Sequence, residues 1–371
     1  MKMKDIPWAK PEIGDEELNE VIRTFKTGWL TTGKNVKNLE SGLAEYFGIK
    51  NAIAVSNGTD AIDVVLKTLG IGPGDEVIIP AFSYIATASA VTYQGAIPVF
   101  VDISLDTMNI LPEKIEAAVS EKTKAIMYID YGGNPAEGDK IRAVGEKIGV
   151  PVILDGAHSI GTVYQGNSTI SKHVISTMSF HMAKTFTTVE GGMIFTQNDD
   201  WDREIRIRIN QGESGKEKYD HILLGTNARM TDIQAAIGLG QLKKLDFILS
   251  GRANAANLYN EYFLDYKGLI NIPSNRGNEI NSYFLYPILI NNRDKVANAL
   301  KENYGIDTRI SWPKPIYEQT LYSSGGHLFK KNDCPNTEII CKKVLNLPMF
   351  PSMNDDDINY VANSLISELS S

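Results

Sequence analysis

The sequence has few cysteines, no long apolar run and no excess of positive charge. Among its 371 residues the two cysteines, Cys334 and Cys341, match neither a CxxC motif nor a zinc ligand set. We therefore predict reduced, partly buried thiols, as in cytosolic proteins. Apolar runs such as residues 52–55 end at turn signals, far short of the ~20 residues that a membrane helix needs. The cysteine count excludes a disulfide-stabilised secreted domain. The short apolar runs predict no membrane span.

The net charge and the N-terminal residues argue against further classes of protein. A formal net charge of -8 argues against a broad basic surface for nucleic acid, although local groups can still bind phosphorylated small molecules. Residues 1–7 lack the apolar core of a signal peptide, so we expect a cytoplasmic protein. His173, His221 and His327 are scattered without metal-like spacing, and no metal site is predicted.

The chain is longer than most single cores, which favours two domains that share a cleft. We predict a large α/β domain over residues 1–245 and a smaller α+β domain over 246–371. Short apolar runs alternate with amphipathic stretches, as buried strands flanked by helices require. The runs lie at 52–55, 77–79, 98–101, 125–129, 152–154 and 193–196. Beyond them the patterns predict one helical region over 231–263, a strand over 283–290, and helices over 295–304 and 355–368.

A lysine lies between a predicted strand end and a glycine turn. Lys184 follows residues 179–183, and Glu190-Gly191-Gly192 comes shortly after it. An amine acts as a nucleophile only after it loses its proton, and partial burial or a neighbouring cation favours this by lowering its pKa. Most isolated lysines lie on the surface, so the position becomes informative only together with the features below.

Three other predicted strand ends carry polar or aromatic residues. Asp155 ends the run 152–154, where a carboxylate can hold the nitrogen of a pyridinium cofactor or, alternatively, cap a helix. Gly58 and Thr59 stand where a strand meets a helix, whose free N–H groups can bind a phosphate or simply be capped. Tyr84 follows another strand and could stack on a planar ring.

Taken together and in this order, these segments resemble the DegT/DnrJ/EryC1/StrS aminotransferases, the sugar aminotransferase branch of fold-type I pyridoxal-phosphate enzymes. The resemblance extends over most of the chain. Four more segments are similar to the family pattern, namely 28–33, 70–77, 227–236 and 347–351. It implies a fold with a large, mostly parallel seven-stranded sheet domain flanked by helices and a smaller α+β C-terminal domain.

The resemblance also implies roles for individual residues. Lys184 would form the Schiff base with pyridoxal 5'-phosphate, Asp155 would pair with the pyridine nitrogen, and His158 would lie against the cofactor near O3'. The remaining implied cofactor contacts are Gly58, Thr59 and Ser179 at the phosphate, Tyr84 on the ring, and Asn227 reaching the phosphate from the partner subunit. The role of Asn227 implies a homodimer whose two subunits share their active sites.

The implied reaction is a transamination in two halves. An amino acid, expected to be L-glutamate, would leave pyridoxamine 5'-phosphate, and a keto sugar would then take the amino group. The expected acceptor is nucleotide-linked, a 3- or 4-keto-6-deoxy hexose. Thr31, Arg229 and the stretch 309–314 with Lys314 are candidates for contacting it.

Departures from the family pattern leave alternatives open. Val189 stands where glycine is frequent, and Ile316-Tyr317 differ from the usual pair near the region that resembles the substrate pocket. A free cyclitol or another ketone could therefore be the acceptor. A dehydratase of the same family is a second alternative, although such enzymes carry histidine at the position of Lys184. A regulator that kept the fold without activity is a third.

Overall fold

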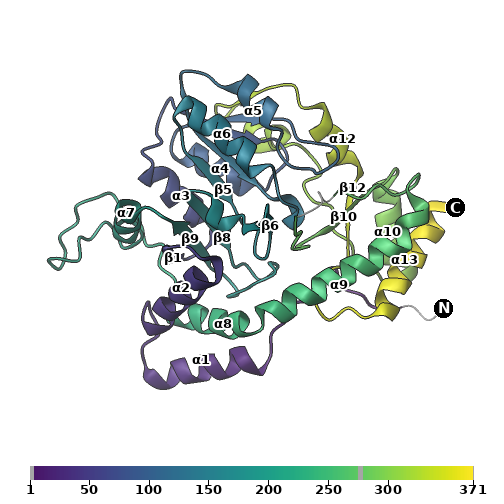
Figure 1. Cartoon of the computed structure of the whole chain (residues 1–371), viewed down its shortest axis with the longest axis horizontal. Coiled ribbons are helices and arrows are strands. Elements are labelled where there is room, and N and C mark those ends of the chain that lie inside the picture. Colours follow the sequence, from purple (N-terminus) through teal and green to yellow (C-terminus); the bar gives the residue numbers. More distant parts are fainter. Residues whose placement is uncertain (1–3, 275–278, 371) are drawn as a thin grey trace.

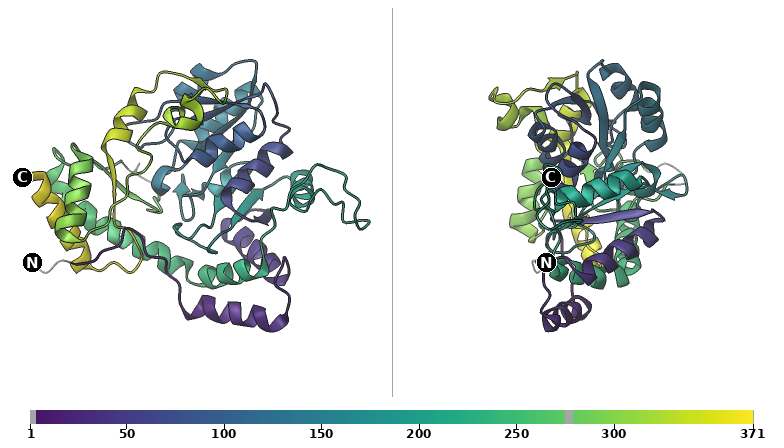
Figure 2. Two further views of the ribbon diagram at one scale, coloured as in Figure 1. Left: turned by 180° about the vertical axis from the view of Figure 1, so that it is seen from behind. Right: turned by 90° about the vertical axis from the view of Figure 1, so that its left-hand side faces the viewer.

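The computed structural model describes residues 4–274 and 279–370. A central sheet carries helices on both faces, and a smaller group of elements lies at one end of the molecule together with both termini (Figure 1, Figure 2). The long helix α9 (Leu245–Phe263) runs from the sheet region to this smaller group. No helix in the described ranges is long and apolar enough to cross a membrane.

The sheet has eight strands within the described part of the chain, and all of them except β9 run parallel. In spatial order they are β1 (Asn51–Val55), β9 (Gly192–Thr196), β8 (Ile175–Ser179), β5 (Val152–Asp155), β4 (Thr123–Ile129), β2 (Glu76–Pro80), β3 (Ile97–Val101) and β11 (Lys330–Lys331). The mostly parallel sheet of the predicted fold class is confirmed. Its seven long strands are joined by one strand of only two residues, β11, at the edge.

Both faces of the sheet are buried, which explains the continuous apolar runs. Successive side chains of a strand point to opposite faces, so that Ala52 and Ala54 lie in one core and Ile53 and Val55 in the other. One core includes α2 (Lys34–Phe47), α5 (Pro112–Ala118), α6 (Gly138–Ile148) and α8 (Asp232–Lys243), and the other α3 (Gly58–Thr68), α4 (Ile85–Tyr93) and α7 (Asp199–Ile209). Helix α1 (Asp15–Thr27) packs on α8.

The smaller group of elements has its own apolar core. It combines α9 with β10 (Tyr286–Leu289), α10 (Arg293–Tyr304), β12 (Val344–Leu347) and α13 (Asp355–Ser370), and Ile6 joins it. The domain boundary between residues 245 and 246 stays a prediction, since β11 from beyond it extends the large sheet. Short elements complete the described chain: β6 (Val163–Tyr164), β7 (Asn167–Ser168), α11 (Thr320–Ser323), α12 (Pro335–Lys343), and the 3-10 turns η1 (Tyr131–Gly133), η2 (Ile170–Lys172), η3 (Leu264–Tyr266) and η4 (Ile316–Glu318).

Two predictions about element boundaries were wrong. The single helical region over 231–263 is two helices, because the backbone of Lys244 leaves the helical conformation between α8 and α9. Its start is as expected, with a capping box formed by Thr231 and Gln234. The strand predicted over 283–290 is shorter, since Tyr283 has a φ of 49°, which extended strands do not allow.

Candidate active site

Five parallel strands end at one edge of the sheet, where their carboxyl ends place the candidate residues. Each strand has one candidate residue at or just after its end. They are Gly58 after β1, Tyr84 after β2, Gly132 after β4, Asp155 in β5 and Ser179 in β8. Such an edge is where open α/β sheets bind their ligands.

Lys184 lies in a tight turn just after β8. Its backbone N–H donates to the carbonyl of His181 at 2.8 Å, and His181 in turn accepts at Nδ1 from the N–H of Ala183 at 3.2 Å. The Lys184 side chain is partly buried, with Nζ 4.7 Å from the centroid of the Phe284 ring. Burial lowers the pKa of Lys184 to about 8, against an opposing effect of the Asp155 charge. The amine is therefore far easier to deprotonate than that of an ordinary lysine.

Asp155 is buried at the end of β5 and is held through both carboxylate oxygens. The hydroxyl of Thr87 donates to Oδ2 at 2.8 Å, and the backbone N–H of Ala157 donates to Oδ1 at 3.3 Å. Burial raises the pKa of Asp155, and the Thr87 hydrogen bond and the Lys184 charge oppose that rise. A turn, not a helix, follows Asp155, so it does not act as a helix cap.

His158 is buried among aromatic rings on the same edge. Its ring lies 4.3 Å from the Phe284 ring and parallel to Trp312, with centroids 6.1 Å apart. Nδ1 accepts from the backbone N–H of Gly132 at 3.3 Å, so a neutral ring carries its proton on Nε2. Burial, and then the charge of Lys184, hold the pKa of His158 well below its usual value. The ring is thus neutral near pH 7.

The first turn of α3 lies directly against the end of β8. A Cβ built on Gly58 would be only 2.7 Å from the Cβ of Ser179, so glycine alone allows this approach. Asn57 caps the helix, its side chain accepting from the N–H of Asp60 at 2.8 Å. The cap of this helix is therefore Asn57, not Gly58 or Thr59. Gly58, Thr59 and Ser179 together place N–H and hydroxyl donors around one helix N-terminus.

Tyr84 is the N-cap residue of α4, shortly after the end of β2, and is 60% exposed. The backbone N–H of Thr87 donates to the carbonyl of Tyr84 at 3.1 Å, so the aromatic ring and the hydroxyl that binds Asp155 come from the same helical turn.

Asn227 and Arg229 flank Ala228, whose carbonyl accepts from the N–H of Ser56 at 2.8 Å, and Arg229 pairs with Val55 at the end of β1. Asn227 is exposed and ends the long loop after α7, which extends away from the rest of the molecule (Figure 1, Figure 2). Arg229 is partly buried and donates to Oδ1 of Asn210 at 2.8 Å. Thr31 is exposed beside Thr32, whose hydroxyl donates to the carbonyl of Met230 at 2.8 Å.

Lys314 is exposed and lies two residues after Trp312, the ring parallel to His158. The stretch 309–314 therefore reaches the candidate site through Trp312, while Arg309 lies over the ring of Trp8 at 5.9 Å.

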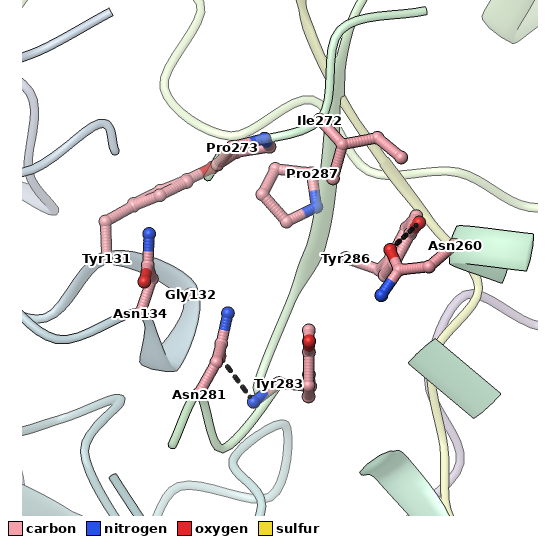
Figure 3. A pocket seen from close by; sticks show the side chains of 10 residues that line it. All are labelled: Tyr131, Gly132, Asn134, Asn260, Ile272, Pro273, Asn281, Tyr283, Tyr286 and Pro287. Atoms are coloured by element: carbon pink, nitrogen blue, oxygen red, sulfur yellow. Dashed lines mark hydrogen bonds between the residues drawn. The ribbon is translucent and has the colours of Figure 1, made fainter. Parts of the chain in front are cut away.

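A cavity of about 220 Å³ lies beside the Gly132 turn (Figure 3). Its walls combine three asparagines, three tyrosines and no charged side chain. Two of the asparagines are held locally: Asn260 accepts from the Tyr286 hydroxyl and Asn281 from the Tyr283 N–H, each at 2.8 Å. Gly132, which lines this cavity, donates its N–H to His158 Nδ1 at 3.3 Å, so the cavity adjoins the candidate active site at this turn.

Sequence reasoning missed Thr87 and Phe284, and it included Trp312 only as a member of the stretch 309–314. Thr87 lies three residues after the predicted Tyr84, but its direction toward Asp155 depends on how α4 packs. Phe284 and Trp312 come from the C-terminal part of the chain, and no local pattern connects them to Lys184 or His158.

Val189 is a strained residue in the loop that follows Lys184. Its φ of 71° lies in the left-handed region, which is unfavourable for a β-branched residue. The departure noted at this position, valine where glycine is frequent, thus falls on a backbone conformation that glycine adopts freely.

Fold and site together define a pyridoxal-phosphate-dependent aminotransferase. Comparison with known proteins shows its family. The chain belongs to the DegT/DnrJ/EryC1/StrS aminotransferase family, whose model matches residues 11–366. It is 35% identical over 376 residues to the spore coat polysaccharide biosynthesis protein SpsC of Bacillus subtilis, with 97% of this chain and 96% of SpsC covered.

Solved structures agree with this placement. Helicobacter pylori PseC, an aminotransferase involved in the biosynthesis of pseudoaminic acid, superposes with a TM-score of 0.92 at 27% identity, covering 99% of this chain and 100% of that one. Bacillus subtilis ntda, solved with bound pyridoxamine phosphate, gives a TM-score of 0.90 at 28% identity and covers 100% and 86%. The cofactor is pyridoxal 5'-phosphate, which cycles with its aminated form, and the enzyme transaminates sugars.

Proposed function

We propose that this aminotransferase moves the amino group of L-glutamate to a nucleotide-linked keto sugar, a 3- or 4-keto-6-deoxy hexose. The observation that carries the catalytic part is the partly buried Lys184 amine, with its pKa lowered to about 8, on the same sheet edge as the buried Asp155. SpsC and PseC, named for polysaccharide and pseudoaminic acid biosynthesis, support a sugar as acceptor. Exposed Thr31 and Lys314, with the partly buried Arg229, are our candidates for contacting the nucleotide.

The residues present fit the cofactor. The close approach of Gly58 to Ser179 brings the Ser179 hydroxyl beside the first turn of α3, whose free backbone N–H groups would bind the phosphate. Thr59 and Ser179 would add hydroxyl donors there. Tyr84, exposed shortly after the end of β2, would stack on the ring, and Asn227 would reach the phosphate from the partner subunit.

The bound cofactor supplies an electron-withdrawing ring that stabilises negative charge developing at the substrate carbon. Asp155 would accept a hydrogen bond from the ring nitrogen and keep it protonated. His158, neutral with its proton on Nε2, would donate to O3'. Lys184 would bind the cofactor carbonyl covalently and, once displaced by the amino acid, carry the proton between the substrate Cα and C4'. A base with a pKa of about 8 suits that transfer near neutral pH.

A homodimer with shared sites is part of the proposal. The loop between α7 and α8 extends away from its own chain, and its apolar side chains Tyr219 and Leu224 are 74% and 85% exposed. Exposed apolar side chains on an extended loop favour contact with another subunit. Asn227, which pairs with Asn210 where this loop returns to the body of the chain, would then act in the partner's site.

The test is an absorbance titration of the purified, pyridoxal-loaded enzyme. L-Glutamate should convert the absorbance band of the lysine-bound cofactor to that of pyridoxamine phosphate. One member of a panel of UDP-, dTDP- and GDP-linked 3-keto and 4-keto sugars should then reverse it. Lys184→Ala should show no cofactor attachment that borohydride can fix. No band change with glutamate, or attachment persisting at another lysine, would contradict the proposal.

The same titration separates the alternatives for the acceptor. Recovery of the band with a free cyclitol or a simple ketone, but with no nucleotide sugar, would replace the nucleotide-linked acceptor by that class. Release of a deoxygenated sugar without net amine transfer would identify a dehydratase instead.

A further inference from the structure

Asp155 is held by a second buried hydroxyl beyond the one that touches it. Thr87 Oγ1 donates to Asp155 Oδ2 at 2.8 Å, and Ser83 Oγ lies 2.7 Å from Thr87 Oγ1. All three side chains are buried. Neither Ser83 nor Thr87 belongs to the catalytic residues described above.

The direction of the hydrogen bonds follows from counting protons. An ionised carboxylate only accepts, and a hydroxyl has one proton to donate. When Thr87 donates to Asp155, its oxygen can only accept from Ser83, so the order is Ser83 to Thr87 to Asp155. Protonation of Asp155 would remove the reason for this order, since the carboxylic acid could donate to Thr87 instead.

We propose that Thr87, oriented by Ser83, is the positioning residue that keeps Asp155 ionised and turned toward the cofactor nitrogen. This inference rests on the proposed role of Asp155. A hydrogen bond to a carboxylate favours the charged form, and here it acts against burial, which disfavours it. With Oδ2 bound to Thr87 and Oδ1 to the N–H of Ala157, the carboxylate cannot rotate freely.

The geometry of α4 ties this hydroxyl to the ring-stacking position. Thr87 lies one helical turn after Tyr84, and its backbone N–H donates to the Tyr84 carbonyl at 3.1 Å. One turn of helix would therefore set both the plane of the cofactor ring, through Tyr84, and the group that faces its nitrogen, through Thr87 and Asp155.

The test compares Thr87→Val, which keeps the shape and removes the hydroxyl, with Thr87→Ser, which keeps the hydroxyl. The main readout is the 15N chemical shift of cofactor labelled at the pyridine nitrogen, which reports whether that nitrogen is protonated. We expect Thr87→Val to move the shift toward the unprotonated value and to slow the glutamate half-reaction about ten- to a hundredfold, as loss of a hydrogen bond to a charged group would. Thr87→Ser should keep both the 15N shift and the rate of the half-reaction close to the wild-type values.

A control on the same helix is Thr92→Val. The Thr92 hydroxyl lies 2.9 Å from the Tyr322 hydroxyl, away from Asp155, and this substitution should leave the 15N shift unchanged. Should Thr87→Val fail to fold, Ser83→Ala carries the same test, because Thr87 then loses the donor that fixes its direction. A shift toward the unprotonated value is expected there too.

Comparison with Asp155→Asn separates this inference from the proposed function. If Asp155→Asn moves the 15N shift while Thr87→Val and Ser83→Ala leave it at the wild-type value, the role of Thr87 is overturned and that of Asp155 stands. If Asp155→Asn also leaves the shift unchanged, Asp155 does not hold the ring nitrogen and both fall.

Discussion

The lowered pKa of Lys184 gives a prediction that can be measured without cofactor or substrate. With a pKa of about 8 the amine is about 24% neutral at pH 7.5, whereas at the ordinary value of 10.5 it would be about 0.1% neutral. The apoprotein should therefore react at Lys184 roughly 240 times faster with an amine-directed reagent than an unperturbed lysine of equal access. Because a lysine is neutral above its pKa, this advantage should fade as the pH rises past 8 toward 10.5.

Competitive amine labelling of the apoprotein over pH 6–11, read peptide by peptide in a mass spectrometer, measures this directly. Lys301 serves as an internal reference in the same sample, since its hydrogen bond to Asp307 raises its pKa. We expect the labelling midpoint of Lys184 near pH 8 and that of Lys301 above 10.5.

Two substitutions should move the Lys184 midpoint in opposite directions. Asp155→Asn removes the negative charge that favours the ammonium form, so the midpoint should fall below 8. Phe284→Ala opens the wall beside Nζ to water and should raise it toward 10.5, since burial is the main cause of the lowering. A wild-type midpoint near 10.5, or a rise in Asp155→Asn, would refute the reasoning.

Two further substitutions test the phosphate position and the subunit contact. Gly58→Ala should destabilise the protein by about 1–3 kcal/mol and weaken cofactor binding, because its Cβ would lie 2.7 Å from that of Ser179. Thermal denaturation and cofactor titration check this against Gly72→Ala, where an added Cβ meets no atom within 4 Å. Leu224→Asp should shift the protein toward monomer in light scattering. Leu328→Asp, at a position 76% exposed beside the β11 edge, should not, and an unchanged dimer in the Leu224 variant would contradict the role of the loop.

Much of the sheet could be predicted because its strands are buried on both faces and therefore uniformly apolar. The strand that leads to Lys184 is an exception. β8 contains Ser176, Thr177 and Ser179, so hydrophobicity alone gave it no predicted range. Its polar side chains are accommodated locally, as where the Ser176 hydroxyl donates to the carbonyl of Ile170 at 2.8 Å. The break at Lys244 escaped prediction for a related reason, since nothing in the local spacing distinguishes two consecutive helices from one.

Some residues of the candidate site could likewise be predicted from the sequence, and others could not. Residues at strand ends, such as Asp155 and Gly58, could be found because strand ends are readable from apolar runs and turns. Thr87 and Phe284 could not, and Trp312 could be found only as a member of the stretch 309–314, since their importance depends on which side chains they touch across the fold. The sequence pattern thus identifies groups that do chemistry, and the packing identifies those that orient and enclose them.

The Phe284 ring contacts both the Lys184 amine and the His158 ring, although it comes from a part of the chain a hundred residues away from either. Phe284 is thus part of the surroundings that bury the amine and lower its pKa. In a fragment that ends before this phenylalanine we expect the pKa of Lys184 to lie closer to its ordinary value. Chemical reactivity at Lys184 can accordingly serve as a signal that assembly is complete, which would make it useful for following refolding in real time.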